Sequence, residues 1–153
     1  METIITNSEK ETKNIAKKIA SKLNKNAVIV LSGELGAGKT KFTEGFLSYF
    51  GLENEISSPT FTIVNEYKNE KVTIYHFDVY RLSDIDEFYA IGGEEYFSKG
   101  ICIIEWGEII EEILPKDCIK ITIEKEEKNF EKRIIKIKGM TIWGMPFIYS
   151  FQH

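Results

Sequence analysis

The stretch Gly33-Glu34-Leu35-Gly36-Ala37-Gly38-Lys39-Thr40 fits the pattern G-x-x-x-x-G-K-[ST] of a phosphate-binding loop. The apolar, β-branched run Ala27–Leu31 precedes it and predicts a buried strand. After Thr40, apolar residues recur at helical spacing, and Gly51 stands where a helix C-terminal cap belongs. The motif therefore lies between a predicted strand and a predicted helix, which is the setting that phosphate binding requires.

The spacing of this loop has a physical reason. Gly33, Gly36 and Gly38 leave room for backbone N–H groups to wrap a polyphosphate. The helix that follows adds unpaired N–H groups and the positive end of its dipole. Lys39 is expected to reach the β- and γ-phosphates and Thr40 to ligate Mg²⁺. The alternative is a glycine-rich turn followed by Lys-Thr by chance, which the strand before the loop and the helix after it argue against. The residues assigned to nucleotide binding are Gly33, Glu34, Leu35, Gly36, Ala37, Gly38, Lys39, Thr40 and Lys41.

Length and composition are those of a globular domain. The chain has 153 residues, 42% hydrophobic and 29% charged, which fits one domain with a substantial core. Its net charge of −4 argues against a general nucleic-acid-binding surface. Because neither a signal-peptide pattern nor an apolar run of membrane-spanning length is present, we expect a cytoplasmic protein. Cys102 and Cys118 fall in apolar runs, which favours buried thiols over a disulfide.

Strand and helix patterns alternate along the rest of the chain. Strands are expected at residues 2–6, 61–67, 72–77, 101–104, 118–123 and 133–137, with a hairpin over 61–77 and a charged turn over 124–132. Ser8 and Glu11 form a capping box ahead of an amphipathic helix. Ser83 is expected to cap another helix that runs through Ile91. The continuous apolar run Ile101–Ile104 is typical of a parallel strand covered on both faces.

A phosphate-binding loop needs an acidic partner for its metal, usually at the C-terminal end of a neighbouring strand. Glu105 ends the clearest buried strand, which places its last residue at the sheet edge where ligands bind. Asp78 ends the hairpin strand and, from the residues alone, is equally an ordinary solvated acid. Trp106 packs either beside the nucleotide or in the core, and His76 on an alternating strand favours a packed or hydrogen-bonded histidine. Thr60 stands in a loop before a strand, where a threonine can sense a γ-phosphate.

Four stretches in order resemble the TsaE family (also called YjeE), the bacterial ATPases of tRNA threonylcarbamoyladenosine biosynthesis. They are the phosphate-binding loop, Ser58-Pro59-Thr60-Phe61, His76-Phe77-Asp78-Val79-Tyr80-Arg81-Leu82 and Ile104-Glu105-Trp106. The loop alone is unspecific, whereas the set of four is specific, and the resemblance spans residues 2 to about 138. It implies an α/β fold of the P-loop NTPase class, with a central parallel sheet flanked by antiparallel strands and helices on both faces.

The resemblance also implies cofactors and partners. The family binds ATP and Mg²⁺, hydrolyses ATP slowly, and acts with TsaD and TsaB, so that tRNA is reached indirectly through these proteins. It places the adenine base near the start of the first helix, around Ser8 to Thr12, where no sharp motif identifies a contact.

Site residues carry over by position. Lys39 and Thr40 resemble the phosphate and Mg²⁺ residues, and Glu105 the second metal ligand. Thr60 and Asp78 resemble the switch threonine and an aspartate near the metal and the attacking water, and Trp106 resembles the tryptophan beside the site. The expected catalytic residues are therefore Lys39, Thr60, Asp78, Glu105 and Trp106, with Thr40 and Glu105 as the metal ligands.

The segment after Gly139 departs from the family pattern. Residues 140–153 are rich in apolar and aromatic side chains. They either pack on the same core or contact a partner or a second copy, and we favour the first. The expected organisation is a P-loop ATPase domain over 1–139 and an apolar tail over 140–153.

Two other functions are compatible with such a loop. A small-molecule kinase usually needs an arginine-rich lid, and this chain offers only Arg81 and Arg133. For ATP hydrolysis, Arg81 is the nearest candidate for an arginine finger by motif. A non-hydrolytic switch, in which nucleotide binding alone orders a partner interface, is the remaining alternative.

Overall fold

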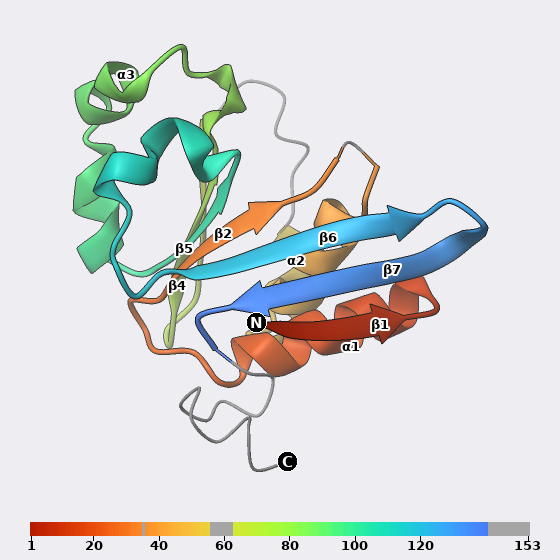
Figure 1. Ribbon diagram of the computed structural model, residues 1–153. Coiled ribbons are helices and arrows are strands. Elements are labelled where there is room, and N and C mark those ends of the chain that lie inside the picture. The colour runs from red at the N-terminus through yellow and green to blue at the C-terminus, as the bar shows by residue number, and fades with distance from the viewer. Residues whose placement is uncertain (35, 56–62, 141–153) are drawn as a thin grey trace.

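The structure is a computed structural model that describes residues 1–34, 36–55 and 63–140, apart from the side chain of Arg81. Within this part of the chain, seven strands form one sheet in the order β1-β7-β6-β2-β5-β4-β3 (Figure 1). The strands are β1 Glu2–Thr6, β2 Val28–Ser32, β3 Val64–Lys68, β4 Thr73–Asp78, β5 Ile101–Glu105, β6 Ile119–Glu126 and β7 Asn129–Lys138. The α-helices are α1 Glu9–Ala20, α2 Lys39–Tyr49 and α3 Ile85–Ala90, and the 3-10 helices are η1 Glu53–Glu55, η2 Val79–Arg81, η3 Gly93–Ser98 and η4 Gly107–Ile113.

The centre of the sheet is parallel and its margins are antiparallel. β2 pairs in parallel with both β5 and β6, and β4 pairs in parallel with β5. β3 runs antiparallel to β4, β7 to β6, and β1 to β7. This confirms the predicted parallel centre with antiparallel flanks.

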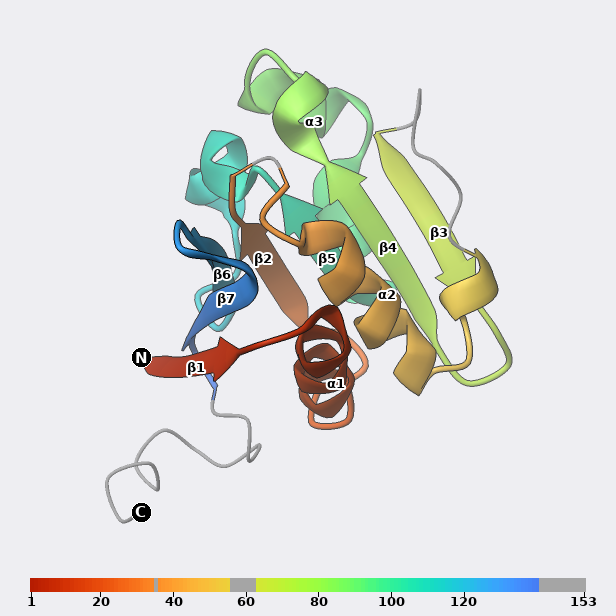
Figure 2. The ribbon, with the colours of Figure 1, turned by 90° about the vertical axis from the view of Figure 1, so that its right-hand side faces the viewer.

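Two hydrophobic cores lie on the two faces of the sheet. One core packs α1 and α2 against inward residues of the central strands, with Phe42 and Phe46 fully buried. The other packs α3 and η4 against β4 and β5 through residues such as Phe77, Phe88 and Ile104. Figure 2 shows α1 and α2 side by side, with α3 across the sheet from them. The predicted coverage of both faces is confirmed, and it explains why β5 is continuously apolar.

The loop–helix unit ends as predicted at Gly51. Its φ of +74° is left-handed, and the N–H of Leu52 returns to the carbonyl of Leu47 at 3.0 Å, which closes the last turn of α2. The capping box at the start of α1 is also present, because the Ser8 hydroxyl accepts the N–H of Glu11 at 3.1 Å.

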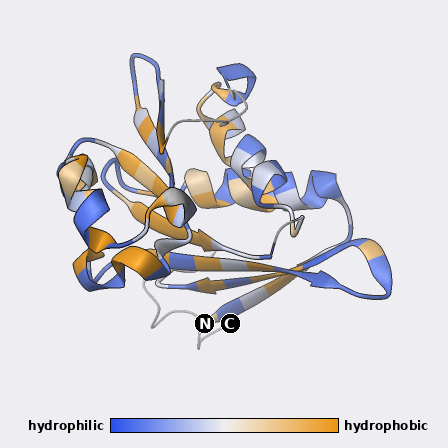
Figure 3. Cartoon of the chain, turned by 90° about the horizontal axis from the view of Figure 1, so that it is seen from above, coloured by the Kyte–Doolittle hydropathy of each residue, from blue (hydrophilic) through white to orange (hydrophobic). Residues whose placement is uncertain are grey.

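Two local predictions are wrong. Asp84, not Ser83, caps α3, since its carboxylate accepts the N–H of Glu87 at 3.2 Å. The charged segment 124–132 is not a turn, because β6 and β7 continue through it and only residues 127–128 form the turn. Cross-strand ion pairs such as Lys132–Glu126, at 2.8 Å, let this charged ribbon extend into solvent. Figure 3 shows its tip to be mostly hydrophilic.

The remaining sequence expectations are resolved in part. Cys102 and Cys118 are free thiols, Cys102 buried and Cys118 half-buried. Met140 is buried in the α1–α2 core, whereas the tail beyond it lies outside the described residues. In the ranges given above, every helix is too short or too polar to cross a membrane.

Candidate nucleotide site

The predicted phosphate-binding loop joins β2 to α2, at the C-terminal edge of the parallel strands. Gly36 and Gly38 have φ of +81° and +106°, a region that favours glycine. An added Cβ at Gly33 would lie 2.7 Å from the carbonyl oxygen of Ile123 in β6, so this position has no room for a side chain. Gly38 is the N-cap of α2 and carries no capping side chain, which leaves the first N–H groups of the helix open to an anion.

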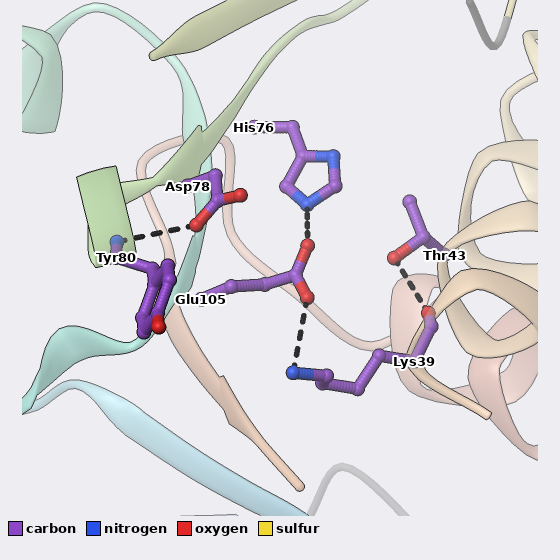
Figure 4. Close-up of polar contacts among 6 residues, drawn as sticks. All are labelled: Lys39, Thr43, His76, Asp78, Tyr80 and Glu105. Atoms are coloured by element: carbon purple, nitrogen blue, oxygen red, sulfur yellow. Dashed lines mark hydrogen bonds and ion pairs between the residues drawn. The ribbon is translucent and has the colours of Figure 1, made fainter. Parts of the chain in front are cut away.

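Glu105 stands at the centre of a short chain of charged groups. One of its carboxylate oxygens lies 3.5 Å from Lys39 Nζ, and the other lies 2.6 Å from His76 Nε2. Figure 4 shows the three side chains meeting from α2, β4 and β5. The side chains of Lys39, His76 and Glu105 are only 11%, 13% and 18% exposed. The predicted hydrogen-bonded role of His76 is confirmed, and its partner is the expected metal ligand.

The electrostatics of Glu105 reflect these contacts. Burial raises the pKa of its carboxyl, but the hydrogen bond and charge of His76 and the charge of Lys39 together outweigh that effect. The net result is a pKa below the ordinary glutamate value, so Glu105 is held as a carboxylate.

Asp78 and Trp106 lie at the same sheet edge. Asp78 is the register partner of Glu105, and its side chain accepts the N–H of Tyr80 at 3.2 Å (Figure 4). Trp106 follows Glu105 with a φ of +64°, the one positive φ of a non-glycine residue in the described ranges. Its ring lies 4.7 Å from Lys39 Nζ and 5.0 Å from the ring of Tyr80. A cation–π contact thus places Trp106 beside the loop lysine.

A cavity of about 320 Å³ joins these groups. It is lined by Glu9, Thr12, Gly36, Gly38, Lys39, Thr40, Lys41, Asp78, Glu105, Trp106, Glu131 and Arg133. Gly33 and Glu34 instead line an adjoining hollow of about 260 Å³, and Ala37 is buried. Leu35 and Thr60 lie outside the described residues.

The cavity also contains residues that sequence reasoning did not assign. Glu9 and Thr12 come from the start of α1, where the resemblance places the base. Glu131 and Arg133 come from β7. The Arg133 Nε donates to the carbonyl oxygen of Ala37, inside the loop itself, at 2.7 Å. Alternation predicts a strand at Arg133, but no sequence signal gives the register that brings it to the loop.

The cavity suits a magnesium–polyphosphate complex. Mg²⁺ uses one or two protein oxygen ligands together with substrate phosphates and water. The Thr40 hydroxyl and the Asp78 and Glu105 carboxylates all line the cavity, so oxygen donors for such an ion are at hand. Within the described ranges there is no group of three or more His, Cys, Asp or Glu side chains of the kind that would hold a metal by itself.

The sheet order, the loop between β2 and α2, and the acids at the ends of β4 and β5 define an α/β protein of the P-loop NTPase fold. The solved structure of YdiB from Bacillus subtilis superposes with a TM-score of 0.69 at 36% identity, over 89% of this chain and 83% of that one.

Comparison of sequences makes the assignment narrower. The family model described as "Threonylcarbamoyl adenosine biosynthesis protein TsaE" matches residues 6–135. TsaE of Rickettsia conorii is 43% identical over 86% of this chain and 74% of its own length. TsaE of Bacillus subtilis is 44% identical over 78% of this chain and 75% of its own length. The chain belongs to the TsaE family of tRNA threonylcarbamoyladenosine biosynthesis.

Proposed function

We propose that this protein is a Mg²⁺-dependent ATPase, slow by itself, that supports TsaD and TsaB in forming threonylcarbamoyladenosine in tRNA. The observation that carries the proposal is the contact between the loop lysine and the strand-end acid. Lys39 and Glu105 lie 3.5 Å apart in a cavity bordered by the N-terminus of α2. Cation, acid and helix N-terminus are the parts that phosphoryl transfer from a nucleotide needs.

Each residue has a role that its position supports. Lys39 and the first N–H groups of α2 would bind phosphate oxygens, and Thr40 and Glu105 would hold the ion. When bound, Mg²⁺ would neutralise charge that develops on the β- and γ-phosphates. Asp78, next to Glu105 in the register, orients the attacking water, and Trp106 covers Lys39. Thr60 keeps the expected role of a γ-phosphate sensor on the strength of the resemblance.

The same site supports the proposal of a slow intrinsic rate and a need for partners. In the described residues, the one guanidinium that lines the cavity belongs to Arg133, and its Nε and Nη1 already donate to backbone carbonyls. Because these bonds hold Arg133 to the backbone, it is not free to move as a finger to the transition state, and hydrolysis is expected to remain slow until a partner completes the site.

The decisive experiment measures ATP hydrolysis with and without TsaB and TsaD. We expect Mg²⁺-dependent turnover that the partners stimulate, and a loss of about 100-fold or more in Lys39→Ala and Glu105→Gln, since the first removes the cation that faces the phosphates and the second removes a ligand that would hold Mg²⁺. Glu111→Gln is the matched control, because Glu111 pairs with exposed Lys120 and does not line the cavity. Unchanged hydrolysis in both site variants would refute the proposal.

A non-hydrolysable ATP analogue separates the enzyme from the switch. If hydrolysis drives repeated cycles, the analogue should support binding to the partners but not repeated rounds of tRNA modification. Sustained modification with the analogue would show that nucleotide binding is sufficient.

A further inference from the structure

Arg133 is bound to the loop on one side and remains open on the other. Its Nε donates to Ala37 O at 2.7 Å, and its Nη1 donates to the carbonyls of Phe130 and Lys132 at 2.8 and 2.9 Å. These bonds fix the guanidinium plane, and in the described structure Nη2 has no acceptor. The covalent geometry of guanidinium makes one Nη2–H parallel to Nε–H, so that this donor points toward the loop beside Ala37.

Arg133 also forms half of a cross-strand pair of like charges. Its register partner on β6 is Lys125. A Cβ added at Gly36 would lie 3.0 Å from Lys125 Nζ, and one added at Gly38 would lie 3.4 Å from Arg133 Nε. The β6–β7 ribbon therefore holds two cations against Gly36 and Gly38, whose φ angles are left-handed.

Two neighbouring lysines of the ribbon are paired with glutamates, but Lys125 and Arg133 are not. Lys132 pairs with Glu126 at 2.8 Å, and Lys136 pairs with Glu124 at 3.1 Å. Among the residues that the structure describes, neither Lys125 nor Arg133 has a carboxylate within ion-pair distance. Like charges placed directly opposite one another destabilise an antiparallel pair. An anion that bound between them and the loop would remove this repulsion.

We propose that Arg133 is a phosphate-binding residue of the nucleotide site, supplied by the β6–β7 ribbon, and that Lys125 beside it strengthens the positive potential there. This inference rests on the proposed function. Arg133 donates from Nη2 to a phosphate oxygen of the nucleotide, because a guanidinium presents the donor geometry that phosphate accepts. Lys125, which is exposed, adds positive potential without a fixed contact. The ribbon thus becomes a second wall of the phosphate site, facing the loop.

The test is equilibrium binding of ATP and of inorganic tripolyphosphate, measured by calorimetry at several salt concentrations. Arg133→Ala should weaken the binding of both ligands by about tenfold or more, since it removes a charged hydrogen bond. Its affinity should also fall less steeply with salt than that of the wild type. Lys125→Ala should weaken both ligands by about two- to threefold, mainly at low salt.

Controls separate contact from folding. Lys132→Ala, the adjacent ribbon cation paired with Glu126, should bind as the wild type does. Arg133→Lys keeps the positive charge but loses the planar guanidinium and its several donors. Its affinity for both ligands should fall between that of the wild type and that of Arg133→Ala. This variant also provides the comparison if Arg133→Ala does not fold.

Three outcomes would overturn the inference. Wild-type affinity in Arg133→Ala would show that Arg133 contributes nothing. Weaker ATP binding with unchanged tripolyphosphate binding would assign it to the nucleoside, and an unaltered salt dependence would reduce it to a support for the loop. If Lys39→Ala still binds ATP normally, the proposed site itself fails, which is a distinct result.

Discussion

At the scale of single residues, Trp106 shows that the backbone beside the site is strained. It follows the last residue of β5, adopts a φ of +64°, and holds its ring against Lys39 and Tyr80. A bulky residue in this region is strained, and such strain persists where the surrounding structure imposes it. The turn that aims Glu105 into the cavity is therefore maintained at a cost to stability.

This strain can be measured with two variants at position 106. Both Trp106→Gly and Trp106→Ala remove the ring, but only glycine tolerates the left-handed conformation. We expect Trp106→Gly to be more stable than Trp106→Ala by about 1 kcal/mol in urea unfolding, the reverse of the usual order. Equal stability, or a more stable alanine variant, would show that the positive φ carries no strain.

How far the sequence predicts the site depends on where each residue lies relative to its motif. Glu105 is predictable from the residues alone, because a buried parallel strand must end at the ligand edge of its sheet. The role of Asp78 is predicted only through the resemblance. From the residues alone, an acid at the end of a hairpin strand that serves a site cannot be told from one that is simply exposed to solvent. Arg133 is not predictable, because its contact depends on the register of two strands that are far from the loop in sequence.

At the scale of elements, α1 and α2 are joined by close packing and by charge. A Cβ on Gly45 would lie 2.3 Å from the carbonyl oxygen of Lys13, so the helices approach where α2 has no side chain. Next to this contact, Glu44 forms ion pairs with Lys13 at 3.0 Å and with Lys41 at 3.5 Å. Because Lys41 lines the cavity, this bridge connects α1 to the phosphate end of α2.

The Glu44 bridge should give a pH-dependent stability. Burial raises the pKa of Glu44, but the hydrogen bonds and charges of Lys13 and Lys41 bring it below its ordinary value. A depressed folded-state pKa means that the bridge stabilises above the unfolded pKa and loses this effect as pH falls through the folded pKa. Urea unfolding should therefore show Glu44→Gln less stable than wild type by about 0.2–1 kcal/mol at pH 7.

The difference between wild type and Glu44→Gln should vanish once pH falls well below about 4. Glu53→Gln, which removes an acid of η1 rather than a residue of the bridge, serves as the control. A difference that stays constant from pH 7 to pH 3 would exclude the bridge as its cause.

The helices and strands were predicted correctly where burial of one face gives the sequence a regular spacing of apolar residues, and incorrectly where no face is buried. The central strands and α1 are predictable because one or both faces meet a core. The outer β6–β7 ribbon has charged residues on both faces, so its composition resembles a turn although its backbone is paired. Ser83 and Asp84 are both good N-caps, and the extended backbone of Asp84 together with its bond to the N–H of Glu87 identifies Asp84 as the cap.

At the scale of the whole molecule, the net charge limits direct contact with tRNA. A chain of net charge −4 lacks the excess positive charge that non-specific nucleic-acid binding requires. Under the proposed function, tRNA must be held by the partner proteins. A nucleotide bound to this protein would then affect tRNA modification only through the contact between this protein and its partners.

If the partner proteins hold the tRNA, the isolated protein should bind it weakly. At about 150 mM salt, the isolated protein should not retain tRNA on a filter at micromolar concentration, because few phosphates would be neutralised. With TsaB, TsaD and ATP present, it should be pulled down in a complex that retains tRNA. Failure to associate with TsaB and TsaD, with or without ATP, would remove the partner proposal, and tight binding of tRNA by the isolated protein would reverse the roles.

Under the proposed function, the pairing of Lys39 with Glu105 would also affect which ligands can bind. Glu105 is a tethered anion that occupies the lysine before any phosphate arrives, at a local concentration fixed by the fold. A lone monophosphate would take Lys39 and leave a buried carboxylate with one cation fewer, so the exchange gains little. A polyphosphate that arrives with a divalent cation gives Glu105 a new positive partner in place of the one lysine that it takes. Under the proposed function, this ion pair would therefore favour metal-bound nucleotide over simple anions.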